Sequence, residues 1–169
     1  MANMQLGQRD RPWRARINFK NGESSATIAA GSCVVLKAAD VSQVVTPATA
    51  GAAPTPALFA GIAAKAMAPN EFGDVIVSGY VPAMTVTRMT RAASSDGWAS
   101  FPAIAIGDYF TIETVNGFAA RSGAGAALAA GYQIVALETL ASATTLASTV
   151  GGAATVYTSA VKAWLRALV

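Results

Sequence analysis

Short runs of valine, isoleucine, threonine and aromatic residues recur along the chain from about residue 26, and glycine, proline, asparagine and aspartate interrupt them at near-regular intervals. Short runs of this composition, bounded by turn residues, are typical of β-strands. We expect an all-β fold, a compact β-barrel or β-sandwich. The predicted strands are Ala26–Ala30, Cys33–Ala38, Gln43–Thr46, Phe59–Met67, Asp74–Val81, Met84–Met89, Tyr109–Val115, Phe118–Arg121, Tyr132–Thr139, Thr155–Thr158 and Val161–Leu168.

Turn residues divide these strands. Asn116-Gly117 predicts a hairpin, because a type I′ turn requires positive φ at both central positions. Ser122–Ala130 is rich in alanine and glycine, and its composition fits either a loop or one short helical turn. Three further turns or loops are predicted at Ala50–Ala57, Pro69–Gly73 and Ser94–Gly97.

The C-terminal segment fits two periodicities, and periodicity alone does not decide between them. A helix stripe would contain Val161, Trp164, Leu165 and Leu168. One face of a strand would contain Val161, Ala163, Leu165, Ala167 and Val169.

A comparison of the two halves favours the strand. Gly31 and Gly107 lie 76 positions apart (107 − 31), and each begins the same succession of turn, strand, hairpin, strand, loop and closing strand. Asp74–Val81 closes the first half, so Val161–Leu168 is expected to close the second as a strand. We therefore expect two related halves, about 26–90 and 100–169, within one domain of residues 26–169.

Composition points to surface that is hidden in an assembly. Hydrophobic residues make up 53% of the 169 residues and charged residues only 12%, about half the usual globular share. Alanine accounts for 39 residues, so much of the apolar content consists of small side chains. Alanine favours helix intrinsically, but the regular spacing of turns favours strands more strongly. The high apolar content excludes an intrinsically disordered chain.

The residue types needed for common active sites are missing. The sequence has no histidine, which excludes Ser-His-Asp triads and most zinc sites. Cys33 is the single cysteine and is expected to be buried and unreactive. Asp74, Asp108 and Glu113 are separated carboxylates on predicted strands or turns. We expect no catalytic, metal-binding or cofactor-binding site, and no enzymatic activity.

Positive charge is concentrated at the N-terminus. Residues 1–20 carry five cations and one anion, a net of +4, and the rest of the chain carries −1 (7 − 8). We expect residues 1–25 to form an extended basic arm. It is either a solvated tail or an arm that docks on a partner, and nucleic-acid binding is a weaker alternative. The candidate contact residues are Arg9, Arg11, Trp13, Arg14 and Arg16.

Membrane insertion is not expected, because the long uncharged stretches contain proline or many serines and threonines. Residues 1–20 contain no apolar core of a secretory signal, so a soluble protein is expected. The tryptophans Trp98 and Trp164 are interpreted as core or interface packing rather than as sugar platforms.

The first half contains the pattern A-G-x-x-V-x-L, V-V-x-P-A-T-A, F-x-G-I-A and G-x-V-x-V-x-G-x-V. It is carried by Ala30-Gly31, Val35, Val44–Ala50, Phe59–Ala63 and Gly73–Val81. This order is similar to that of small bacteriophage capsid decoration, or cement, proteins, and the resemblance covers about residues 26–168. It implies a β module on the outer surface of an icosahedral capsid, often a trimer, made in the host cytoplasm and located in the virion.

The resemblance also implies partners. These are the major capsid protein and further copies of the chain, without direct contact to nucleic acid or membrane. A tail, spike or head-fibre base, or a glycan-binding module on the virion, is the alternative function. A small enzyme that uses carboxylates is a third class, disfavoured by the absence of histidine and of any carboxylate pair.

Overall fold

The chain is all-β, as the sequence predicts. The computed structural model describes residues 13–47, 49, 58–91, 97–101, 103–112, 118–121, 132–147 and 155–167. Its strands are β1 Arg14–Asn21, β2 Cys33–Lys37, β3 Asp40–Val45, β4 Phe59–Ala63, β5 Phe72–Arg91, β6 Gly97–Phe101, β7 Tyr109–Ile112, β8 Phe118–Arg121, β9 Tyr132–Ala136, β10 Ala143–Ala147 and β11 Thr155–Ala167.

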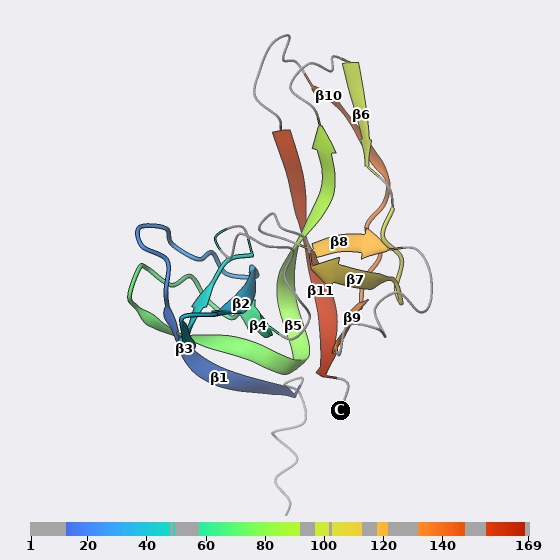
Figure 1. Cartoon of the computed structure of the whole chain (residues 1–169). Coiled ribbons are helices and arrows are strands. Elements are labelled where there is room, and N and C mark those ends of the chain that lie inside the picture. Colours follow the sequence, from blue (N-terminus) through green and yellow to red (C-terminus); the bar gives the residue numbers. More distant parts are fainter. Residues whose placement is uncertain are drawn as a thin grey trace, which may run out of the picture.

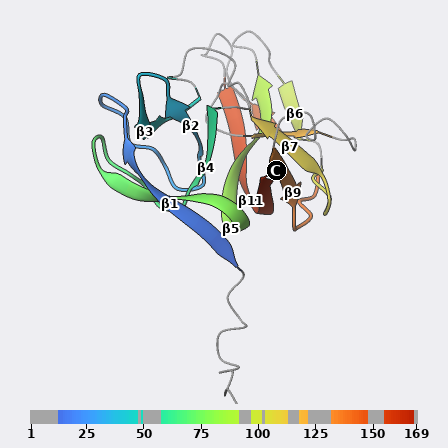
Figure 2. The same cartoon turned by 60° about the horizontal axis from the view of Figure 1, so that its bottom comes forward.

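Nine of these strands form one sheet that closes into two rings. The order is β1-β3-β2-β4-β5-β11-β9-β7-β8, and the additional pairings β1–β5 and β5–β8 close it. We call β1–β4 with the first half of β5 the N-terminal ring. The second half of β5 with β7, β8, β9 and β11 is the C-terminal ring. Figures 1 and 2 show the two groups of strands side by side, with β5 running between them.

The two rings repeat the same hydrogen bonds. The amide of Gly31 donates to the Ala63 carbonyl at 2.8 Å, and the amide of Gly107 donates to the Ala136 carbonyl at 3.0 Å. Both glycines have positive φ, 80° and 93°. An isolated antiparallel bridge precedes each glycine, Ile28↔Met67 in the N-terminal ring and Ile104↔Leu140 in the C-terminal ring. The prediction of two related halves is therefore confirmed at the level of individual bonds.

Parallel pairing reveals how the repeats join. β1 runs parallel to β3 with Lys20 opposite Gln43, and β5 runs parallel to β8 with Thr87 opposite Ala119. Gln43 and Ala119 differ by the same 76 positions (119 − 43) as the two glycines. The second half of β5 thus has the place in the C-terminal ring that β1 has in the N-terminal ring.

The predicted arm, residues 1–25, differs from the structure in its second half. Arg14–Asn21 forms β1, which pairs antiparallel with β5 from Arg14↔Gly79 to Lys20↔Phe72. Ala15, Ile17 and Phe19 alternate with polar residues, which is the period of a strand. The high density of cations concealed this alternation in the sequence. Residues 1–12, including Arg9 and Arg11, lie outside the described part.

Two pairs of predicted strands are continuous. Asp74–Val81 and Met84–Met89 lie within β5, and Thr155–Thr158 and Val161–Leu168 lie within β11. Pro82 is compatible with β5 because the register with β11 shifts between Val161 and Ala163, opposite this residue. Proline has no amide hydrogen, and such irregularities tolerate it.

Other predictions differ locally. Ala26–Ala30 contributes only the bridge residue Ile28, and the predicted loop ending at Gly97 instead leads into β6. β10 was not predicted at all. β7 and β8 are antiparallel as expected, but Phe118 lies opposite Ile112, whereas a two-residue turn would place Val115 there. The segments Ala50–Ala57, Asn116-Gly117 and Ser122–Ala130 lie outside the described residues.

The buried hydrophobic residues form two clusters, one inside the N-terminal ring and one that joins the C-terminal ring to it. The N-terminal ring encloses Ile28, Val34, Val44, Ala63, Met67 and Val75. The second cluster contains Phe110, Ile134, Val161 and Leu165 of the C-terminal ring together with Cys33, Ile62 and Ile76 of the N-terminal strands. Neighbours along β2, β4 and β5 therefore point alternately into their own ring and toward the other ring, as expected for extended strands. Cys33 is buried as predicted, and burial raises the pKa of its thiol.

A projection extends from the rings. β6 and β10 form a separate two-stranded antiparallel sheet, and the end of β5 pairs beside it with the beginning of β11. Figure 1 shows these four segments standing above the rings. We call Thr87–Arg91, Gly97–Phe101, Ala143–Ala147 and Thr155–Thr158 the finger.

The two turn glycines give a matched test of the repeat. A Cβ at Gly31 would overlap the backbone oxygen of Ala83, whereas a Cβ at Gly107 would meet no atom within 4 Å. We expect Gly107→Ala to cost about 1 kcal/mol, because only the positive φ is strained. Gly31→Ala should cost clearly more in chemical denaturation. Equal losses for the two variants would contradict the close approach at Gly31.

Candidate interaction face

The described residues do not assemble an active site of the usual kinds. No group of three or more acidic or cysteine side chains in the described ranges is placed to hold a metal ion. Asp74 binds Arg16 and Asn18, and Asp108 accepts a hydrogen bond from the Ala105 amide at 2.8 Å within its turn. These carboxylates therefore have local structural partners, and the candidate site is a surface.

The predicted contact residues separate into different environments. Trp13 is 62% exposed, and Arg14 is half-buried on β1. Arg16 forms an ion pair with Asp74, with 3.1 Å between Nη1 and Oδ2. Hydrogen bonds from Asn18 and Arg16 lower the pKa of Asp74. Arg16 is thus already engaged within the chain, and Trp13 is the better candidate for contact with a partner.

Trp13, directly before β1, begins a row of residues that continues across β5, β11 and β9. The Tyr80 amide donates to the Trp13 carbonyl at 2.9 Å, and Tyr80 lies directly opposite Trp164, which lies opposite Val135. Residues opposite one another in antiparallel strands share a face and their side chains approach closely. We call Trp13, Tyr80 and Trp164 the aromatic row. Trp164 remains 37% exposed.

A glycine allows this row to form. Gly79 precedes Tyr80, has φ of 96°, and lies opposite Arg14 on one side and Leu165 on the other. A Cβ there would overlap the carbonyl oxygen of Trp13. The absence of a side chain therefore lets β1 approach β5 at the point where β5 also pairs with β11.

Cations flank the aromatic row. Lys162 and Arg166 lie two positions before and after Trp164 on β11 and are exposed on the same face. The ammonium of Lys162 lies 3.1 Å from a carboxylate oxygen of Glu138, whose other oxygen accepts the Lys162 amide at 2.7 Å. Arg166 has no carboxylate partner among the described residues. The face therefore combines aromatic area with a cation available to a partner.

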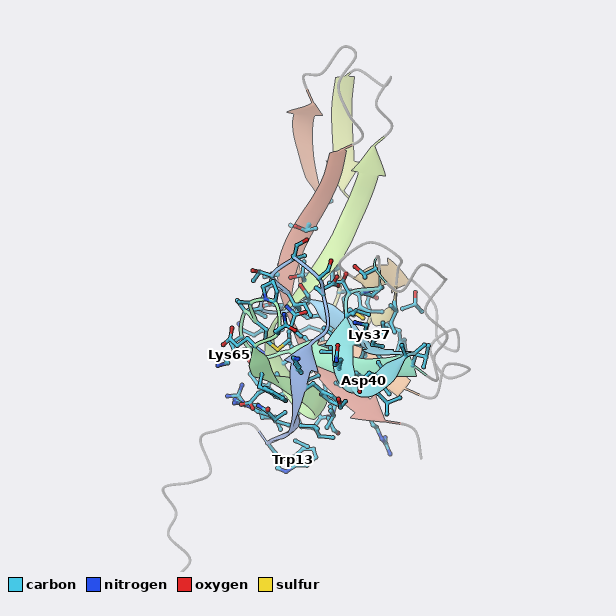
Figure 3. The ribbon with its side chains drawn as sticks, turned by 60° about the vertical axis from the view of Figure 1, so that its left-hand side comes forward. Trp13, Lys37, Asp40 and Lys65 are labelled. Carbon is cyan, nitrogen blue, oxygen red and sulfur yellow. The ribbon has the colours of Figure 1, made fainter. Side chains whose placement is uncertain are left out.

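The aromatic row lies at the end of the molecule opposite the finger. Figure 3 shows Trp13 at the bottom and the finger strands at the top, and Figure 1 shows β1 and β11 reaching the same lower end. Residues 1–12, with Arg9 and Arg11, precede Trp13 directly in the sequence. This basic segment therefore joins the described part of the chain beside the aromatic row.

The sequence identifies Trp13 as a candidate contact residue. It does not identify Tyr80, and it gives no sign that Trp164 lies near Trp13. The strand periodicity of residues 161–169 leaves Lys162, Trp164 and Arg166 on the face opposite Val161, Ala163 and Leu165, and this is the signal that the sequence offers. The juxtaposition with Trp13 depends on β5, which pairs with β1 and β11 at the same point. No local pattern reports such a pairing.

Comparison with known proteins adds no assignment. No family model matches the chain, and no curated protein matches its sequence. Within the described residues, no helix has the length and apolar character needed to span a bilayer.

The Glu138–Lys162 pair predicts a pH dependence of stability. Hydrogen bonds from Lys162 lower the pKa of Glu138 below 4.5, and Glu138 raises the pKa of Lys162 above 10.5. The ion pair therefore stabilises the fold fully between pH 4.5 and pH 10.5, where both side chains are charged. Its contribution is lost as the pH falls through the lowered pKa of Glu138 or rises through the raised pKa of Lys162.

We expect Glu138→Gln to lower the thermal midpoint at pH 7, and the difference from the unmodified chain to shrink as the pH falls below 4.5. Thermal unfolding followed by circular dichroism between pH 3 and 7 measures this. A difference that stays constant over that range would show that the pair does not act through charge.

Proposed function

We propose that the protein is a bacteriophage capsid decoration protein that binds the outer surface of an assembled capsid and stabilises it. The observation that carries the proposal is the aromatic row with Arg166, which has no carboxylate partner within the described ranges, at the end of a compact β body where the basic segment joins. This supports the partner-contact interpretation of the N-terminal segment. The resemblance noted in the sequence, which covers about residues 26–168, supplies the class of partner.

The chemistry of the face suits a protein partner. Exposed tryptophan and tyrosine contribute large apolar area while retaining a polar group for hydrogen bonding. Tryptophan, tyrosine and arginine are enriched among residues that dominate binding energy. Arg166, and Arg9 and Arg11 of the preceding segment, can pair with carboxylates of the major capsid protein.

The body supports such a role physically. A protein that binds only the assembled lattice stabilises it by mass action, and the gain increases with the ratio of its free concentration to its dissociation constant. Closing the sheet into rings removes free strand edges, which prevents unspecific pairing at high copy number. The low proportion of charged residues fits subunit and lattice contacts.

The alternative function is another component of the virion surface, such as a tail, spike or head-fibre base, or a glycan-binding module. Two exposed tryptophans in one row favour the glycan-binding variant, because aromatic rings offer flat apolar area. Location distinguishes the candidates. Occupancy of many regular outer-capsid sites supports decoration, whereas density only at the tail or at one vertex contradicts it.

The direct experiment mixes the purified chain with shells of the phage that encodes it, prepared without this protein. Sedimentation and imaging then measure how many copies bind, on mature and on immature shells. We expect saturable binding to mature shells at many equivalent sites. Absence of binding to either type of shell would refute the proposal.

The aromatic row predicts which variants lose binding. Trp13→Ala and Trp164→Ala should each weaken shell binding about tenfold or more, as expected for tryptophan anchors. Phe72→Ala is the matched control, because Phe72 is 60% exposed and lies opposite Lys20, at the far end of β1. Equal binding by all three variants would contradict a role for the aromatic row.

Deletion of residues 2–12 tests the basic segment separately and leaves β1 intact. We expect the truncated chain to fold and to bind shells more weakly, with a smaller dependence on salt, because Arg9 and Arg11 are lost. Removal of residues 14–20 as well would remove a strand of the N-terminal ring and would confuse folding with binding.

A further inference from the structure

The repeat identifies the finger as an addition to the C-terminal ring. In the N-terminal ring, residues 22–27 connect the end of β1 to the bridge residue Ile28. The equivalent path in the C-terminal ring runs from Arg88 to Ile104 and contains the end of β5 and all of β6. In the N-terminal ring, residues 68–72 lead from Met67 to Gly73. Their counterpart, from Leu140 to Val161, contains β10 and the beginning of β11.

Both additions emerge from one corner of the ring. In the N-terminal ring the two short turns are hydrogen-bonded neighbours. The Asn21 amide donates to the Glu71 carbonyl at 2.8 Å, and the Asn70 amide donates to the Asn21 carbonyl at 3.1 Å. At the equivalent corner of the C-terminal ring, the long connections pair with each other as β6–β10 and β5–β11.

The finger is therefore not needed to close a ring. The N-terminal ring reaches the same closed topology with short turns in both places. Since the fold is complete without the finger, a role outside the fold is the physical reason to retain it.

The finger also has the free strand edges that the rings lack. Within the described strands, β6 pairs only with β10, and β10 only with β6. Two-stranded sheets are marginally stable in water unless another element covers them. Neither Gly97–Phe101 nor Ala143–Ala147 contains a charged residue or a proline, the usual protection of an exposed edge. Unprotected edges of this kind indicate a strand partner.

We propose that the finger pairs edge to edge with the finger of a second copy of this chain. The chain carries a net charge of +3, and the uncharged β6–β10 ribbon lets two copies approach without repulsion between charges on these strands. Each copy presents the same edge, so a symmetric pairing satisfies both at once. The aromatic row lies at the opposite end of the molecule and stays available to another partner (Figure 3).

Self-association in the absence of shells tests this proposal. A fingerless variant replaces residues 89–103 by the sequence of residues 22–27, and residues 141–160 by that of residues 68–72. Analytical ultracentrifugation should find the full chain at a multiple of 17.1 kDa and the fingerless variant as a monomer with a β-sheet circular dichroism spectrum. A monomeric full chain at all concentrations, or a fingerless variant that associates like the full chain, would overturn the proposal.

A single substitution covers the case in which the fingerless variant does not fold. Ala99→Lys places a charge within β6, and Ala39→Lys makes the same change in an exposed turn of the N-terminal ring. We expect Ala99→Lys to weaken self-association tenfold or more and Ala39→Lys to leave it unchanged. Equal association by the two variants would refute a finger contact.

The same variants separate this proposal from the proposed function. Loss of self-association with retained shell binding, at reduced avidity, supports the finger contact. Loss of shell binding by Ala99→Lys, with unchanged self-association, would identify the shell as the partner of the finger and overturn the proposal. Failure of shell binding by the unmodified chain would refute decoration and leave the self-association result standing.

Discussion

The structure depends on the double use of one strand. The first half of β5 closes the N-terminal ring through β1 and β4, and its second half opens the C-terminal ring through β8 and β11. A backbone can form hydrogen bonds on both sides, so one long strand can belong to two rings of the same sheet. Loss of β5 would open both rings, which makes this strand the common support of the two cores.

β5 can belong to both rings only because neighbouring strands approach its backbone closely. At Gly79, β1 and β11 meet β5 from both sides. Gly61, which has φ of 139°, lies on β4 where this strand pairs antiparallel with β5. A Cβ at Gly61 would overlap the Ile76 carbonyl oxygen, as a Cβ at Gly79 would overlap that of Trp13. The aromatic row is a consequence of this geometry, because it is built where three strands meet.

The two rings are repeats of one another, and the finger is the part of the C-terminal ring that has no counterpart in the N-terminal ring. This difference suggests a division of roles. The rings provide two closed units with buried cores, and closure leaves them without free edges. The aromatic row and the finger lie at opposite ends (Figure 3), so two different contacts can form without competition. This arrangement suits a protein that binds a surface at one end and a neighbouring copy at the other, so the proposed function and the proposed finger contact are compatible.

The sequence by itself determined the strand-rich character, the repeat and the location of several strands. Alternating or continuous apolar runs between turn residues are local signals, and β2, β4, β8 and β9 lie close to their predicted positions. The Gly31–Gly107 spacing revealed the repeat because both turns require positive φ.

Only the tertiary structure decided how these strands are paired. β1 and the continuity of β5 past Pro82 depend on partners distant in sequence, and the finger strands β6 and β10 pair across more than forty positions, as Ala99 with Thr145. The aromatic row needs Trp13, just before β1, to meet Tyr80 of β5 and Trp164 of β11. Strand register is a property of pairs, and a single segment contains no information about which edge it will meet.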